Sequence, residues 1–315
     1  MLDRSPYAAL VERLPVRRDE IALRGGVTAC WTYGPADAAR TIVFLHGLRG
    51  DHHGLEPIVA HLAGLRVVVP DLPGFGESPR LPDDAHDVAG YAAWAGELLA
   101  VVGGEPVLAG HSFGSIVAAA TAVATRPRAL VLVNPIATSA LHGPHRAMTR
   151  LTVGYHRLAA ALPERAGTAL LRHPLVTRIA STTMTTTRDP ALRRWIRAEH
   201  RRYFAGFADR RVLLEAFHAS IAHDVAEFAP DIAVPTLLVA AERDDIAPLP
   251  AQEALVGRFC DARLVVVPRA GHLAHYEAPA AVAAAIMTHG IPARDPKTPR
   301  HRDEAGGGEA FACGS

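Results

Sequence analysis

The chain has 315 residues, of which 49% are hydrophobic and 21% charged, and its formal net charge is +1 at pH 7. This length and composition allow one large domain, or one domain with an insertion, around a packed core. The balanced charge gives no sign of nucleic-acid binding, and no stretch of about 20 apolar residues predicts a membrane span.

The N-terminal segment and the cysteines indicate the cellular compartment in which we expect the protein, and the C-terminal segment has a composition of its own. The N-terminal segment lacks the apolar core and small-residue cleavage site of a signal peptide. Cys30, Cys260 and Cys313 are few and widely spaced, which predicts neither a disulfide framework nor a metal site. We therefore expect a reducing, cytoplasmic environment. Residues 293–315, rich in glycine and mixed charge, are expected to be disordered.

Short runs of valine, isoleucine and leucine alternate with helix-compatible stretches along most of the chain. The predicted strands are Asp19–Leu23, Thr28–Tyr33, Thr41–Leu45, Arg66–Val69, Pro106–Ala109, Ala129–Val133, Pro235–Ala240 and Arg263–Val267. The predicted helices are Gly54–Leu62, His86–Val102, Ser115–Thr125, Ala251–Phe259 and Glu277–Thr288. This alternation predicts an α/β fold with a mostly parallel sheet and helices on both faces. The first two strands are close enough in sequence to form an antiparallel hairpin at one edge.

The alternation stops after Val133, and helical patterning dominates until the next strand. We therefore expect residues 1–136 and 230–292 to form the core, and residues 137–229 to form a helical cap over the sheet. The stretch Leu141–Val212 contains fourteen arginines, no lysine and four acidic residues, which is an excess of ten positive charges. Two interpretations stay open: solvated helix surfaces, or attraction of an anionic substrate.

A serine lies where the fifth predicted strand passes into a helix, in the sequence Gly-His-Ser-Phe-Gly. So short a turn forces Ser112 into a strained backbone conformation. A Cβ two residues before or after it would collide with the turn, and Gly110 and Gly114 avoid that collision. The hydroxyl then projects above the C-terminal edge of the sheet, close to a helix N-terminus. The pattern is that of a nucleophile elbow.

A serine hydroxyl needs a base to become nucleophilic, and the base needs an orienting acid. The loops after the last two predicted strands offer Asp244 as the acid and His272 as the base. Asp245 is the alternative acid, although a neighbouring loop residue should point elsewhere. His275 is the alternative base, but it should lie on the first turn of the last helix.

The loop after the third strand offers further groups. The backbone N–H of Leu48 and that of Phe113 are the expected donors of an oxyanion hole. His52 and His53 suggest a metal site. Adjacent histidines do not easily converge on one ion, however, and we find no third ligand with suitable spacing, so no metal is expected.

Five stretches between about Thr41 and Pro279 together resemble the α/β-hydrolase family with a helical cap. They read VFLHGLRG, VVPDLPGFGESP, LAGHSFGS, LLVAAERDDIAP and AGHLAHYEAP. The resemblance implies an eight-stranded sheet carrying Ser112, Asp244 and His272 as a triad, with Leu48 and Phe113 as oxyanion donors. Relatives often have glycine where this chain has Ala241. Dehalogenases and epoxide hydrolases of this family have aspartate at the elbow, so Ser112 favours acyl transfer to water.

These observations predict an esterase-like serine hydrolase that cleaves a carboxylic ester or related acyl compound through an acyl-enzyme, without a cofactor. One alternative is a carbon–carbon bond hydrolase or lyase acting on a carboxylate-bearing or coenzyme A-bearing substrate. Another is a ligand-binding protein that retains the fold without catalysis. In each case the expected partner is a small molecule, and the oligomeric state is not predicted.

Overall fold

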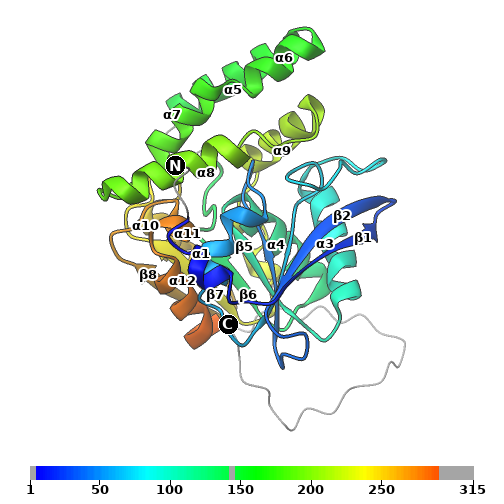
Figure 1. The fold of residues 1–315 in the computed structure, drawn as a ribbon, viewed down its shortest axis with the longest axis vertical. Helices are drawn as coiled ribbons and strands as arrows, with labels where there is room; N and C mark the ends of the chain where they lie inside the picture. Colours follow the sequence, from blue (N-terminus) through cyan, green and yellow to red (C-terminus); the bar gives the residue numbers. More distant parts are fainter. Residues whose placement is uncertain (1–4, 142–145, 291–315) are drawn as a thin grey trace.

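The computed structural model describes residues 5–141 and 146–290 (Figure 1). It is built on one eight-stranded sheet with the strand order β1-β2-β4-β3-β5-β6-β7-β8. The strands are β1 Val16–Leu23, β2 Gly26–Tyr33, β3 Thr41–Leu45, β4 Arg66–Pro70, β5 Val107–His111, β6 Leu130–Val133, β7 Thr236–Ala241 and β8 Ala262–Val267. All eight predicted strands are present, so the predicted fold class is confirmed. The expected disordered tail lies outside the described residues.

The sheet is antiparallel at one edge and parallel elsewhere. β1 and β2 form the predicted hairpin, and β2 also pairs antiparallel with β4. From β4 through β3, β5, β6 and β7 to β8, every neighbouring pair is parallel. Every residue of β5, β6 and β7 is buried, which explains why these strands appear in the sequence as continuous apolar runs.

Helices cover both faces of the sheet. One face packs against α3 (Val88–Val102), α4 (Phe113–Thr125) and α10 (Leu249–Val256). The other packs against α2 (Glu56–Val59) and α12 (Pro279–Ala285), which runs into a π-helical turn at Ile286–Gly290. Two short elements, α1 (Ala8–Val11) and the 3₁₀ turn η1 (His52–Gly54), both contact α2.

The last predicted helix, Glu277–Thr288, corresponds to α12 and its π-helical turn, and a separate short helix precedes it. The structure has α11 (Ala274–Glu277) followed by α12, with Ala278 between them at φ −147° and ψ 47°. Pro279 disfavours the helical conformation of the residue before it, which explains the break. The predicted helix Gly54–Leu62 is shorter in the structure, where α2 spans only Glu56–Val59 and the 3₁₀ turn η1 precedes it.

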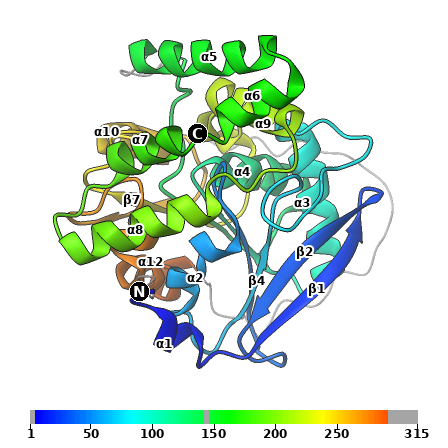
Figure 2. The same ribbon diagram turned by 45° about the horizontal axis from the view of Figure 1, so that its top comes forward.

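The chain between β6 and β7 is helical, as expected. Its helices are α5 (Arg146–Ala161), α6 (Glu164–Leu171), α7 (Pro174–Met184), α8 (Pro190–Tyr203) and α9 (Arg210–Ala222), followed by 3₁₀ turns at Val225–Glu227 and Ala229–Asp231. Figures 1 and 2 show α5 to α8 gathered at one end of the molecule. Trp195 of α8 packs against Leu273 and Tyr276, which ties this helical segment to the core.

The cysteines differ from one another. Cys30 is a buried free thiol, Cys260 is exposed, and Cys313 lies outside the described residues. In the described ranges, no helix combines the length and apolarity needed to span a bilayer.

Candidate active site

Ser112 occupies a strained turn between β5 and α4. Its φ is 53° and its ψ −119°, a region that side chains rarely adopt. A Cβ on Gly110 would collide with the backbone carbonyl of Gly114. A Cβ on Gly114 would lie 2.5 Å from the carbonyl oxygens of Leu45 and His46. Steric crowding therefore requires glycine at both positions. At Gly114, however, the crowding comes from the end of β3 rather than from the turn itself.

Three predicted residues meet at the C-terminal edge of the sheet. The Oγ of Ser112 lies 2.8 Å from Nε2 of His272, and Nδ1 of His272 lies 2.8 Å from Oδ2 of Asp244. Asp244 follows β7 and His272 follows β8, so adjacent parallel strands deliver them to the same edge. When Nδ1 donates its proton to the carboxylate, Nε2 is free to accept one from the hydroxyl.

Asp244 is held as a carboxylate. Its burial alone would raise its pKa, but the adjacent His272 and the N–H groups of Ile246 and Ala247 outweigh that effect and keep the pKa below its ordinary value. Those N–H groups donate to Oδ1 at 2.9 and 3.0 Å. An acid that stays ionised can orient the imidazole and stabilise its protonated form.

Asn134, which the sequence interpretation did not single out, also holds the acid. It follows β6 with a φ of 45°. Its Nδ2 donates to Oδ2 of Asp244 at 3.0 Å and to the carbonyl of Gly271 at 3.0 Å. Asn134 therefore fixes the acid relative to the loop that carries His272. The only signal in the sequence was an asparagine directly after a buried strand.

The two alternative residues lie elsewhere. Asp245 is exposed, so it does not compete for the imidazole of His272. His275 lies on α11 with its ring 4.2 Å from that of His111. Its burial keeps its pKa well below the usual value. The structure therefore brings Asp244 and His272, rather than their neighbours, to Ser112.

The expected oxyanion donors lie beside the serine. Leu48 and Phe113 line the same cavity as Ser112. Phe113 is the first residue of α4, where backbone N–H groups have no partner inside the helix. A Cβ on Gly47 would lie 3.3 Å from Cβ of Ser112, so the Leu48 loop packs directly on the elbow. In the described ranges, neither N–H group donates to another protein group.

The cavity above Ser112 has a volume of about 290 Å³. This is near the lower end for small-molecule sites, so it suits a small substrate. Its walls are mainly apolar side chains from the loops that follow β3, β6, β7 and β8, from the elbow and from the helical segment. They include Leu48, Leu55, Phe113, Ile136, Met184, Phe204, Ile221, Ile246 and Leu273.

Arg49 lines the cavity, and among the described residues no other arginine does. It is only 6% exposed. Its Nε donates to the carbonyl of Phe204 and its Nη2 to that of Leu171, at the C-terminal ends of α8 and α6. Burial lowers the pKa of Arg49 to about 10, so the guanidinium remains charged at neutral pH. Arg49 therefore links the loop of Leu48 to the helical segment.

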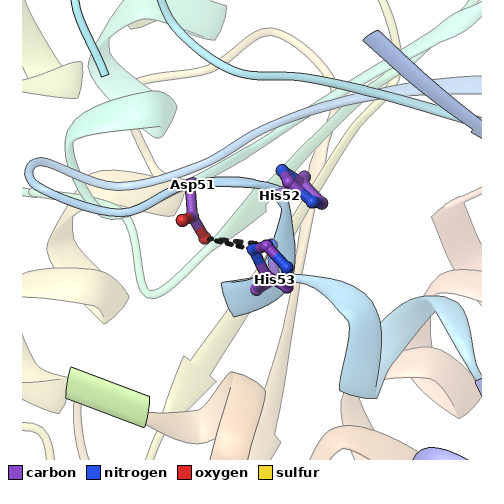
Figure 3. A group of neighbouring side chains, drawn as sticks. All are labelled: Asp51, His52 and His53. Atoms are coloured by element: carbon purple, nitrogen blue, oxygen red, sulfur yellow. Dashed lines mark hydrogen bonds and ion pairs between the residues drawn. The ribbon is translucent and has the colours of Figure 1, made fainter. Parts of the chain in front are cut away.

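The histidine pair near the site does not fit a shared metal ion. Donor atoms of Asp51, His52 and His53 lie within 4.8 Å of one another, and the sequence interpretation overlooked Asp51 as a third donor. Figure 3 shows Asp51 paired with His53, while His52 stands apart. The His52 ring stacks on Trp31 at 3.4 Å, and its centroid lies 3.9 Å from that of the tilted His53 ring. In addition, Nδ1 of His52 is bonded to Asp71.

The sheet and the groups at its rim define a hydrolase-type α/β protein. The chain belongs to the α/β-hydrolase family: a model described as "Alpha/beta hydrolase family" matches residues 42–285.

Solved structures agree with this family. An esterase from Thermogutta terrifontis, solved with malate bound, is 25% identical, with a TM-score of 0.68 over 86% of this chain and 97% of that one. An enol-lactonase from Burkholderia xenovorans is 23% identical, with a TM-score of 0.67 over 86% and 99%. A carboxylesterase from Bacillus subtilis is 19% identical, with a TM-score of 0.67 over 90% and 95%. The last two likenesses show the fold alone.

The steric role of Gly114 can be measured. Gly114→Ala should lower the free energy of unfolding by about 1–3 kcal/mol, because the new methyl group forces β3 away from the elbow. Gly154→Ala is the matched control, since a Cβ there meets nothing within 4 Å on the exposed face of α5. It should be neutral, or stabilising by about 0.5–1 kcal/mol. Urea denaturation compares the two, and equal stabilities would contradict the steric argument.

Buried neutral histidines should make the protein sensitive to acid. Burial lowers the pKa of His156 to about 4 despite its hydrogen bond to the carbonyl of Thr152. Between about pH 6.5 and pH 4 the unfolded chain binds a proton there that the folded protein does not. Stability should therefore fall with pH in that window, by about 1.4 kcal/mol per pH unit for this group. His156→Gln should reduce the slope measured by urea denaturation by that amount, and an unchanged slope would refute the assignment.

Proposed function

We propose that this protein is an esterase-like serine hydrolase that cleaves a small carboxylic ester or related acyl compound. The observation that carries the proposal is the hydrogen-bonded series from Ser112 through His272 to Asp244, set beside an apolar cavity. A buried carboxylate, an imidazole and a hydroxyl at such distances are the arrangement that activates a serine for acyl transfer.

The reaction follows from this geometry. His272 removes the proton of Ser112 as its Oγ attacks the ester carbonyl, and Asp244 stabilises the imidazolium that forms. The N–H groups of Leu48 and Phe113 bind the oxyanion, a contribution on the order of 10²–10³ in rate for one donor. His272 then protonates the leaving alcohol. In the second half it activates water, which releases the acid from Ser112.

We assign residues 137–229 as a cap and residues 1–136 and 230–292 as the core. Support comes from Met184, Tyr203 and Phe204 of the helical segment, which line the cavity opposite the elbow. Such a cover excludes water and restricts the size of the acyl group.

A second candidate is carbon–carbon bond cleavage or elimination on an anionic substrate, and the buried charge of Arg49 favours it. Two of its donors already hold the carbonyls of Leu171 and Phe204, however, and the carboxyl groups of Asp51 and Glu199 line the same cavity. A neutral ester is therefore the better fit. Faster turnover of a dienoic ketoacid than of p-nitrophenyl butyrate would reverse this preference.

Arginines of the helical segment give the anionic candidate little support. Arg172 donates to the carbonyl of Phe207. Arg210 donates to the carbonyls of Ala159 and Leu162 near the end of α5 and pairs with Glu164. These side chains stabilise the helical segment itself, which agrees with the interpretation of its charge as a structural feature.

Removing the nucleophile tests the proposal. Ser112→Ala should lower kcat for p-nitrophenyl butyrate by on the order of 10⁴-fold or more, because among the described residues Ser112 alone places a hydroxyl against His272. Thermal unfolding should show a folded protein. A variant that still turns over the ester at the wild-type rate would contradict the mechanism, and an inert wild-type protein would favour the ligand-binding alternative.

The identity of the acid is tested by a matched pair of neighbours. Asp244→Asn should reduce kcat by roughly 10⁴-fold, because the amide favours the wrong imidazole tautomer. Asp245→Asn makes the same chemical change on an exposed side chain and should keep activity near the wild-type level. Steady-state kinetics at pH 8 distinguishes the two, and the reverse ranking would transfer the role to Asp245.

A further inference from the structure

The loop that carries Leu48, the expected oxyanion donor, adopts a conformation that its sequence does not favour. Residues 47–50 form a turn, which is closed by the N–H of Gly50 donating to the carbonyl of Gly47 at 3.0 Å. Arg49 is the third residue of this turn and has a φ of 61°. A turn with a positive φ at its third residue usually has glycine or asparagine there. The outlier indicates that the arginine side chain serves a purpose that glycine could not.

This turn fixes the direction of the Leu48 N–H group. That group and the carbonyl of Gly47 belong to one planar peptide unit and point in opposite directions. The carbonyl accepts from the N–H of Gly50 and from Nδ1 of His46, the latter at 2.9 Å. The proton of His46 is on Nδ1 because its Nε2 accepts from the N–H of Leu72. If the third residue of the turn lost its positive φ, the bond from Gly50 would break, and the peptide unit that carries the Leu48 N–H could rotate.

The side chain of Arg49 is anchored outside the turn, in the helical segment. Its guanidinium donates to the carbonyl of Leu171 at 2.8 Å and to that of Phe204 at 3.1 Å, at the C-terminal ends of α6 and α8. The carbonyls at a helix C-terminus carry partial negative charge, which favours a cation there. The guanidinium also lies over the rings of Phe204 and Phe207, 4.7 Å and 5.6 Å from their centroids. These contacts stabilise a buried charge and offset the strain of the backbone that carries it.

We propose that Arg49 is a positioning residue for the oxyanion hole. Its contacts with the ends of α6 and α8 hold the turn at residues 47–50 in its strained conformation, and the turn in its turn directs the N–H of Leu48. Formation of the oxyanion hole is thereby coupled to the position of these two helices. The inference rests on the proposed ester hydrolysis at Ser112, because it specifies what keeps the oxyanion donor of that reaction in place.

Two variants of Arg49 test the role of the turn. Arg49→Met keeps an unbranched side chain but loses the anchor, so kcat for p-nitrophenyl butyrate should fall by about tenfold or more, toward the loss of one oxyanion donor. KM should change by less than about threefold, since the lost interaction acts in the transition state. Arg49→Gly loses the anchor as well, but glycine adopts a positive φ without strain, so its kcat should exceed that of Arg49→Met by about threefold or more.

The order of these two variants distinguishes positioning from packing. If Arg49 merely filled space, Arg49→Gly would be the more damaging change, because it leaves the larger cavity. Equal losses in both variants would mean that the charge itself is required and that the turn is not. Either result would overturn the inference. Urea denaturation of both variants shows whether the protein measured is folded.

Arg172→Met is the matched control. Arg172 also donates to a carbonyl of the helical segment, that of Phe207, and its guanidinium lies 4.7 Å from the centroid of the Phe207 ring. It belongs to the end of α6 and not to the turn that carries Leu48. Its replacement should therefore leave kcat within about twofold of the wild-type value. A loss as large as that of Arg49→Met would show that any weakening of the helical segment slows the reaction, which contradicts a specific role of Arg49.

The failure of this inference can be distinguished from failure of the proposed function. If the wild-type protein hydrolyses the ester and Arg49→Met does so equally fast, the positioning role is refuted although the hydrolase stands. If the wild-type protein hydrolyses no ester, the proposed function fails, and hydrogen exchange of the Gly50 amide, measured by NMR, still tests the turn. That exchange should be about tenfold faster in Arg49→Met than in the wild-type protein and in Arg172→Met. Equal exchange in all three proteins would overturn the inference.

Discussion

The hydrogen bond between Ser112 and His272 joins residues 160 positions apart, and the rest of the site depends on it. It forms because the turn between β5 and α4 and the loop after β8 both lie at the C-terminal edge of the sheet. Strand β5 must pass into α4 within a single strained residue, and the loop after β8 must return the imidazole to that point. The glycines at 110 and 114 permit the turn, and Asn134 joins the acid to the loop of His272. The packing of the sheet therefore fixes where the side chains of Ser112, His272 and Asp244 lie.

Several polar contacts join the helical segment to the core, among them those of Glu277 with the backbone of Thr186 and Thr187, and Arg49 supplies two more. Its guanidinium binds carbonyls at the ends of α6 and α8, while its backbone follows the expected oxyanion donor Leu48. A change in the position of those helices would therefore act on the same loop that binds the oxyanion. The small cavity beneath them has mainly apolar walls, which suits a compact, uncharged substrate.

Much of this could be predicted because the physical signals were local. Short runs rich in valine, isoleucine and leucine, several of them continuous, predicted the eight strands, and the short Gly-His-Ser-Phe-Gly turn predicted the elbow. Asn134 was missed because an asparagine after a strand has many uses, and only the tertiary fold brings it to Asp244. Arg49 was missed because counting charges in the helical segment does not reveal which guanidinium is buried. Pro279 was a local signal that the helix begins there, and the predicted start at Glu277 overlooked it.

The most direct measurement of the central claim is covalent labelling with a fluorophosphonate, followed by peptide mass mapping. A serine activated by His272 should react at Ser112 in the wild-type protein, and His272→Gln should slow labelling by on the order of 10³-fold or more, since the hydroxyl is then an ordinary alcohol. Absence of an adduct on Ser112, or equal labelling rates in the two proteins, would contradict the account.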